Sequence, residues 1–97
     1  MHENDKQLIR VRFFGAFRGV VTTPSVTIEI ASDGCVADLR KCLLRYFDDN
    51  LDDNHNSTRA QSLVGASAFA TDAVVLREDS PLYNVREVAI LPPVCGG

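Results

Sequence analysis

The residues best suited to chemistry stand at the end of the sequence, where an apolar segment is followed by Pro92-Pro93-Val94-Cys95-Gly96-Gly97. Two prolines favour an extended conformation, so residues 92–97 could project roughly 20 Å at ~3.3 Å per residue. Glycine lacks a Cβ, so the tip could enter a narrow site in another protein. The α-carboxylate of Gly97 is therefore the candidate reactive group. It needs activation, for instance as an acyl-adenylate, before it accepts sulfur or an amine, and a thiocarboxylate there would be a sulfur nucleophile.

Other residue types that often carry chemistry do not form a convincing site. His2 lies near the terminus and His55 in an expected loop, so neither is held as a general base must be. Four residues have the spacing of calcium ligands: Asp48, Asn50, Asp52 and Asp53. However, Asp53 replaces the required glycine and Arg59 replaces the bidentate glutamate. We interpret this run as a solvated loop and expect no metal site.

The three cysteines are interpreted as reduced thiols. Cys35 and Cys42 would lie roughly 10 Å apart along a helix, which exceeds the separation of about 7 Å that a disulfide allows. Reduced thiols are typical of the cytosol. The pattern places Cys42 near the core, and Cys35 as a reactive thiol at a helix start is the less favoured alternative.

Composition limits the class of protein. The 97 residues are 45% hydrophobic and 24% charged, which is typical of one globular domain, here residues 1–97. The net charge of −3 and the pI near 5.2 argue against a nucleic-acid partner, which requires clustered Lys and Arg. No apolar run reaches the about 20 residues that span a bilayer, and the polar start lacks the apolar core of a signal peptide. We expect a cytoplasmic protein with no membrane partner.

Alternating apolar residues predict three strands: Leu8–Phe14, Val26–Ile30 and Glu87–Leu91. The first two follow each other closely, which favours a hairpin. Their inward residues, together with those of the last strand, are Ile9, Val11, Phe13, Val26, Ile28, Ile30, Val88 and Ile90. Phe17 fits either the core or an interface.

A helix is predicted over Cys35–Phe47, with Val36, Leu39, Leu43 and Phe47 on one face. Residues 48–62 are rich in Asp and Asn and are expected to form a polar loop. Two short apolar runs, Leu63–Ala66 and Ala73–Leu76, are expected to be strands separated by a turn near Thr71-Asp72. A further turn is expected at Asp79–Leu82.

The alternation also predicts an apolar surface beside the tail. If the inward residues face the core, Phe14 and Leu91 face outward, and Leu76 is expected to join them on the exposed sheet face. Contiguous exposed apolar residues mark interfaces.

Three segments resemble a known family. Arg10–Arg18 with its Phe13-Phe14 pair, Ser80-Pro81-Leu82, and Val88–Gly97 with its Pro-Pro-x-x-Gly-Gly ending are similar to the small, sulfur-carrier subunits of molybdopterin synthase, of the MoaD/ThiS type. The resemblance implies an α+β fold of the ubiquitin-like β-grasp kind, a mixed sheet wrapped around one main helix. Residues 48–62 look like an insertion in it.

The resemblance also implies a function. Gly97, with Gly96 beside it, would be adenylated by an activating enzyme that uses ATP and Mg, converted to a thiocarboxylate, and inserted into the large synthase subunit. There it would donate sulfur to cyclic pyranopterin monophosphate. The catalytic side chains would belong to the large subunit, in a heterotetramer, so this chain would be neither an enzyme nor a holder of a tightly bound cofactor. The implied partner contacts are Phe14, Arg18, Leu76, Leu91, Pro92, Pro93, Val94 and Cys95.

Departures from the family leave alternatives open. Asn84-Val85-Arg86 stands where the family usually has an Asp-Gly turn, and Cys95 is an uncommon neighbour of the glycines. Sulfur delivery for thiamine or tRNA thiolation is a second hypothesis. A ubiquitin-like modifier joined to lysines through Gly97 is a third, and a plain interaction domain with a dispensable Gly97 is a fourth.

Overall fold

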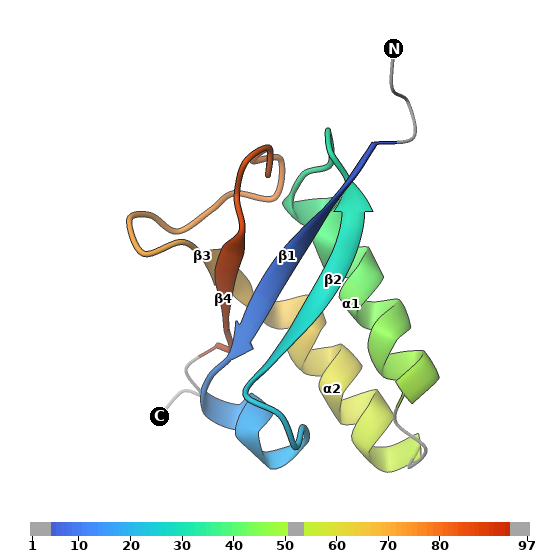
Figure 1. Ribbon diagram of the computed structural model, residues 1–97. Helices are drawn as coiled ribbons and strands as arrows, with labels where there is room; N and C mark the ends of the chain where they lie inside the picture. Colours follow the sequence, from blue (N-terminus) through green and yellow to red (C-terminus); the bar gives the residue numbers. More distant parts are fainter. Residues whose placement is uncertain (1–4, 51–53, 94–97) are drawn as a thin grey trace.

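The computed structural model describes residues 5–50 and 54–93, with the side chains of Asn54 and His55 excepted (Figure 1). Its elements are β1 (Lys6–Phe13), the 3-10 helix η1 (Gly15–Gly19), β2 (Ser25–Ala31), α1 (Val36–Asn50), α2 (Asn54–Ala66), β3 (Ala68–Ala70) and β4 (Glu87–Leu91). The predicted reactive residues Gly96 and Gly97, and the predicted contacts Val94 and Cys95, lie outside the described residues. No helix within the described ranges is both long and apolar enough to cross a bilayer.

The four strands form one mixed sheet in the order β2-β1-β4-β3. Strands β1 and β2 form the predicted antiparallel hairpin, from Lys6↔Ala31 to Arg12↔Ser25. Strand β4 runs parallel to β1 and antiparallel to β3. Figure 1 shows α1 and α2 on the same face of this sheet. The arrangement is the expected β-grasp, with β1 and β4 at the centre.

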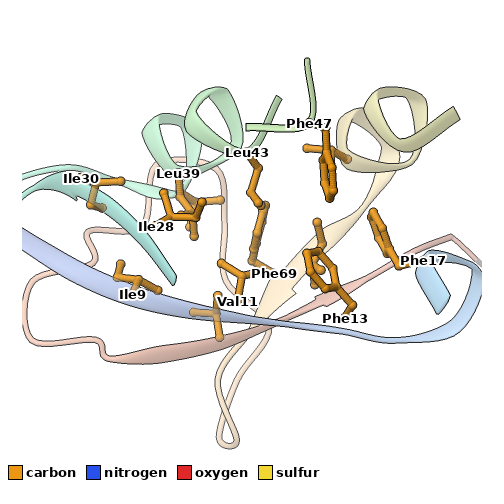
Figure 2. Close-up of a cluster of buried hydrophobic side chains, with 14 of the residues drawn as sticks. Ile9, Val11, Phe13, Phe17, Ile28, Ile30, Leu39, Leu43, Phe47 and Phe69 are labelled. Carbon is orange, nitrogen blue, oxygen red and sulfur yellow. The ribbon is translucent and has the colours of Figure 1, made fainter. Parts of the chain in front are cut away.

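The core lies between the sheet and the helices, and large apolar side chains build it (Figure 2). The predicted inward residues of β1 and β4 are buried, as are all four residues of the predicted α1 face. Val26 alone of the predicted set is only half-buried. Phe17 is fully buried, with its ring centroid 5.5 Å from that of Phe13, so it belongs to the core and not to an interface.

The predicted polar loop over residues 48–62 is wrong. Helix α1 continues to Asn50, and α2 occupies most of the remainder. The buried face of α2 consists of Ser57, Ala60 and Val64, spaced as one side of a helix. The hydroxyl of Ser57 donates a hydrogen bond to the carbonyl of Phe47 at 3.4 Å. Because small side chains form this face, the segment lacks the large apolar residues by which sequence patterns reveal a helix.

The two short predicted strands are also wrong in place. Leu63–Ala66 forms the end of α2, and the third strand is Ala68–Ala70. The chain does turn near Thr71-Asp72, where the N–H of Thr71 donates to the carbonyl of Val74 at 2.9 Å. The return segment pairs with β3 through a single bridge, Ala70↔Val75.

The turn before β4 has Asn84-Val85-Arg86 where the family that the sequence resembles usually has Asp-Gly. Its backbone nevertheless has the geometry of a turn that favours glycine. Asn84 has a φ of 67°, and the N–H of Val85 donates to the carbonyl of Leu82 at 2.9 Å. A positive φ at the third position is the mark of a type II turn, which accepts Gly or Asn there. Asn84 therefore takes the place of the glycine.

Candidate functional site

Strand β4 holds the start of the C-terminal tail at the centre of the sheet. It pairs with β1 from Arg10↔Glu87 to Phe13↔Ile90, and with β3 from Ala68↔Leu91 to Ala70↔Ala89. Pro92 and Pro93 follow at once, and neither has an N–H to continue a ladder. Pro92 is half-buried and Pro93 is exposed. The tail thus leaves from a strand that is hydrogen-bonded along both edges.

The first turn after β1 lies against the first residue of the tail. Gly15 has a φ of 61°, and a Cβ built on it would stand 3.0 Å from Cγ of Pro92. Both features favour glycine, since other residues rarely adopt this φ and Cβ atoms rarely approach so closely. Figure 1 shows the beginning of η1 next to the end of β4. Gly15 and Pro92 therefore form a tight contact at the base of the tail.

Phe14 and Leu91 face outward, as predicted. Continuing the β1–β4 register by one step places them beside each other, on the face opposite to Phe13 and Ile90. Leu91 is 36% exposed, and Phe14 is half-buried in extended backbone, with a φ of −134° and a ψ of 161°. The guanidinium of Arg12 lies over the Phe14 ring, 5.3 Å from its centroid. This contact covers part of the ring and holds it in place.

We call the group of Arg12, Phe14, Gly15, Leu91 and Pro92 the tail-base surface. A shallow hollow adjoins it on the outer sheet face, lined by Arg12, Ala70, Thr71, Asp72, Glu87, Val88 and Ala89. Arg10 and Glu87 form an exposed ion pair there, with a separation of 3.7 Å. Exposed pairs of this kind contribute little to stability. The surface thus offers apolar contact area with cationic side chains next to it.

The outward orientation predicted for Leu76 is wrong. Its N–H donates to the carbonyl of Phe69 at 2.7 Å, and its side chain is half-buried and packs against the core. Val75 instead pairs with Ala70 and is 66% exposed, while its neighbour Val74 is 56% exposed. The sequence pattern does not predict that these two valines are exposed. Val75 alternates with Leu76, but nothing in the local sequence indicates which of these two residues faces outward.

Arg18 is exposed, near the end of η1. Helix η1 carries Phe17 into the core and leaves Arg18 at the surface beside a hollow lined by Val21, Thr22, Thr23 and Pro24. Its exposure is compatible with a contact to a partner. The described residues therefore bring Phe14, Leu91 and Pro92 together and leave Leu76 apart from them.

Among the residues that the structure describes, two carboxyl groups have lowered pKa values, and both hold α1 in place. The backbone N–H of Cys35 donates to Asp38 Oδ2 at 2.9 Å, which caps the helix and lowers the pKa of Asp38. The hydrogen bond from Arg40 lowers the pKa of Glu78.

Cys35 and Cys42 are half-buried free thiols. Within residues 5–50 and 54–93, no three His, Cys, Asp or Glu side chains gather as metal ligands would.

Comparison with known proteins supports the fold. No protein-family model and no curated protein matches the sequence. Among solved structures, the chain is similar to the crystal structure of SAMP1 from Haloferax volcanii, with a TM-score of 0.64 and 16% identity. The match covers 94% of this chain and 100% of that one. At this identity the likeness shows the fold, which is the ubiquitin-like β-grasp.

Proposed function

We propose that this protein is a ubiquitin-like sulfur carrier that works through the carboxylate of Gly97, as the small subunit of molybdopterin synthase. One observation carries the proposal. The ending Pro-Pro-x-x-Gly-Gly directly continues β4, a strand that is paired along both edges. A firm base and a thin glycine tip suit a tail that delivers its terminal group into the active site of another protein.

The proposed chemistry has two steps at Gly97. A carboxylate oxygen attacks the α-phosphorus of ATP on an activating enzyme, and pyrophosphate leaves with Mg. Hydrosulfide (HS⁻) from the sulfur source then attacks the carbonyl carbon of the acyl-adenylate and loses its proton, and AMP leaves with one of the former carboxylate oxygens. The product is a thiocarboxylate, whose sulfur displaces an oxygen substituent of the pyranopterin precursor on the large subunit. Water then hydrolyses the resulting thioester, which leaves the sulfur on the precursor and restores the carboxylate of Gly97. ATP and Mg belong to the activating enzyme in this scheme, and this chain contributes no catalytic side chain.

The tail-base surface is the proposed contact to both partners. Leu91 and the uncovered part of the half-buried Phe14 supply apolar area immediately beside the tail, and Arg12 adds positive charge. Arg18, exposed on η1, is a further proposed contact. Central apolar anchors with polar neighbours are typical of energetically important contacts in protein interfaces. An enzyme that receives the tail would cover this surface at the same time.

The test is the intact mass of the chain after incubation with ATP, Mg, an activating enzyme and a sulfur source, followed by fragmentation. We expect one C-terminal oxygen to be replaced by sulfur at Gly97. A chain without Gly96 and Gly97 is the control, and it should fold normally and stay unmodified. Linkage of Gly97 to lysines of other proteins would instead establish a protein modifier. An unchanged terminus with a fully active enzyme would refute both.

The pathway is tested in a second experiment. The thiocarboxylate form is mixed with a purified large subunit and cyclic pyranopterin monophosphate, and the dithiolene product is measured by mass. Product formation supports the molybdopterin proposal. A thiocarboxylate that transfers no sulfur here, but does so to a thiazole precursor or to tRNA, would assign the carrier to the other pathways.

A further inference from the structure

The contact between Gly15 and Pro92 joins the two central strands where both end. The β1–β4 register places Phe13 opposite Ile90, so two steps further Gly15 lies opposite Pro92. The ring of Pro92 occupies the space that a side chain on Gly15 would fill. A Cβ built on Gly15 would lie 3.0 Å from Cγ and 3.6 Å from Cδ of Pro92. The positive φ of Gly15 turns the chain away from the sheet at this point. The ring therefore rests directly on backbone.

Such a contact fixes a direction as well as a position. The ring of Pro92 locks its own φ, and Pro93 adds a second fixed φ. The first described part of the tail is therefore stiff, and its direction depends on how the Pro92 ring is seated. A change of about 10° at the base would move a tip roughly 20 Å away by about 3.5 Å. Misplacement of a reacting group by about 1 Å can reduce a rate ~100-fold.

We propose that Gly15 is a positioning residue that aims the C-terminal tail, by allowing the Pro92 ring to seat against its backbone. This inference rests on the proposed function only for its effect on activation, because the direction of the tail can be measured without any enzyme. A side chain at position 15 would displace the ring and change the direction in which the chain leaves β4. The terminal carboxylate would then reach the activating site less often.

The test compares Gly15→Ala with Gly19→Ala. Both glycines belong to η1, but a Cβ at Gly19 would meet nothing within 4 Å, and its φ lies outside the strained positive range. A second variant, Pro92→Ala, removes the ring and keeps Gly15, so it remains informative if Gly15→Ala folds poorly. Amide spectra and urea unfolding establish for each variant that the sheet is intact.

Direction is measured with a nitroxide label on Cys95, in a chain where Cys35 and Cys42 are replaced by serine. The profile of paramagnetic broadening over the sheet amides reports where the tail points. We expect this profile to shift in Gly15→Ala and to spread in Pro92→Ala, while Gly19→Ala matches the parent. With unlabelled chains, kcat/KM for activation should fall by about tenfold or more in the first two variants only.

Each result decides the inference. Unchanged broadening in both Gly15→Ala and Pro92→Ala would overturn it, because the contact would then not aim the tail. A shifted profile with unchanged kcat/KM would overturn it as well, since direction would not matter to activation. If the parent chain itself is not activated, the proposed function fails, and the broadening profiles alone decide whether Gly15 sets the direction of the tail.

Discussion

Arg40 of α1 contacts the end of α2, strand β3 and the segment around Glu78. Its replacement therefore gives the sharpest test of how the helices are held to the sheet. From α1 its Nη1 donates to the carbonyls of Val64 at 2.6 Å and Ser67 at 2.8 Å. Its Nε and Nη2 pair with the two carboxylate oxygens of Glu78 at 2.9 and 2.7 Å. The guanidinium also lies 5.0 Å from the ring centroid of Phe69. Only 17% of the Arg40 side chain is exposed.

The magnitude follows from these contacts. Hydrogen bonds from a charged donor contribute about 1.5–3 kcal/mol each. We take the lower end for the two carbonyls, because water can enter the space that Arg40→Ala leaves. The side chain of Glu78 is 55% exposed, so its ion pair adds no more than about 1 kcal/mol. Arg40→Ala should therefore lower the free energy of unfolding by about 3 kcal/mol, which corresponds to roughly 15 °C in Tm for a domain of this size.

Urea and thermal unfolding followed by circular dichroism measure this loss. Arg40→Lys should lose about half as much, because an ammonium cannot match the planar fork that reaches three partners. Glu78→Gln should cost at most about 1 kcal/mol. Arg45→Ala, at an exposed position of the same helix, is the control and should cost less than about 0.5 kcal/mol. A loss in Glu78→Gln as large as that in Arg40→Ala would refute the role assigned to the carbonyl contacts.

The same pair predicts a pH dependence. Arg40 lowers the pKa of Glu78 in the folded state, while the pKa of Glu78 in the unfolded chain is the ordinary 4.5. The pair therefore contributes its full stabilisation when the pH is above 4.5. That contribution is lost as the pH falls through the lower folded pKa. The stability difference between the parent and Arg40→Ala should therefore shrink at acid pH, and a difference that grows on acidification would contradict the assignment.

Two further predictions concern the outer face and the turn before β4. Val75→Glu should change the free energy of unfolding by less than about 0.5 kcal/mol, because Val75 is exposed. Leu76→Glu should lower that free energy by about 2–3 kcal/mol, because it places a charge against the core. Urea unfolding of both variants tests which of the two residues faces the core. Asn84→Ala should cost about 1 kcal/mol, because its φ is positive, whereas Asn84→Gly should be nearly neutral. Equal losses in the two Asn84 variants would mean that the side chain matters and not the backbone.

Large apolar side chains made much of the fold predictable. In β1, β2 and β4 the alternation of bulky residues marks both the strand and its inward face, and only Val26 falls short of burial. In α1 four such residues recur at helical spacing, and all are buried. These patterns are local, so they can be interpreted without knowing what packs against them.

Helix α2 was not predictable for the opposite reason. Its buried face consists of Ala60, Val64 and Ser57, and none of its exposed residues that the structure describes is a large apolar one. Small residues can be buried here because α2 packs closely on α1, where the carbonyl of Phe47 receives the Ser57 hydroxyl. Tertiary contact therefore supplies what the local pattern lacks.

The orientation of Leu76 depends on strand pairings that cannot be predicted from the residues next to it in the sequence. Strand β3 has three residues, too few for an alternation to show which side is inward. Its pairing with β4 buries Phe69, and the bridge from Ala70 to Val75 then places Leu76 on the core side. The pairing of β4 with β3 determines which side of β3 faces the core, and the pairing of Ala70 with Val75 then determines the same for residues 74–76. Neither pairing can be seen in the local sequence.

The candidate site shows the same division between local and non-local information. The tail motif and the outward direction of Phe14 and Leu91 follow from residues adjacent in sequence. Gly15 directly follows the predicted first strand and begins η1, but no residue near it in the sequence indicates what it contacts. Its contact with Pro92 requires β1 and β4 to be parallel neighbours and in one particular register, because a shift by one residue would place Leu91 or Pro93 opposite Gly15. The same register that buries Val11, Phe13, Val88 and Ile90 therefore also seats the Pro92 ring on the one residue there that has no side chain to obstruct it.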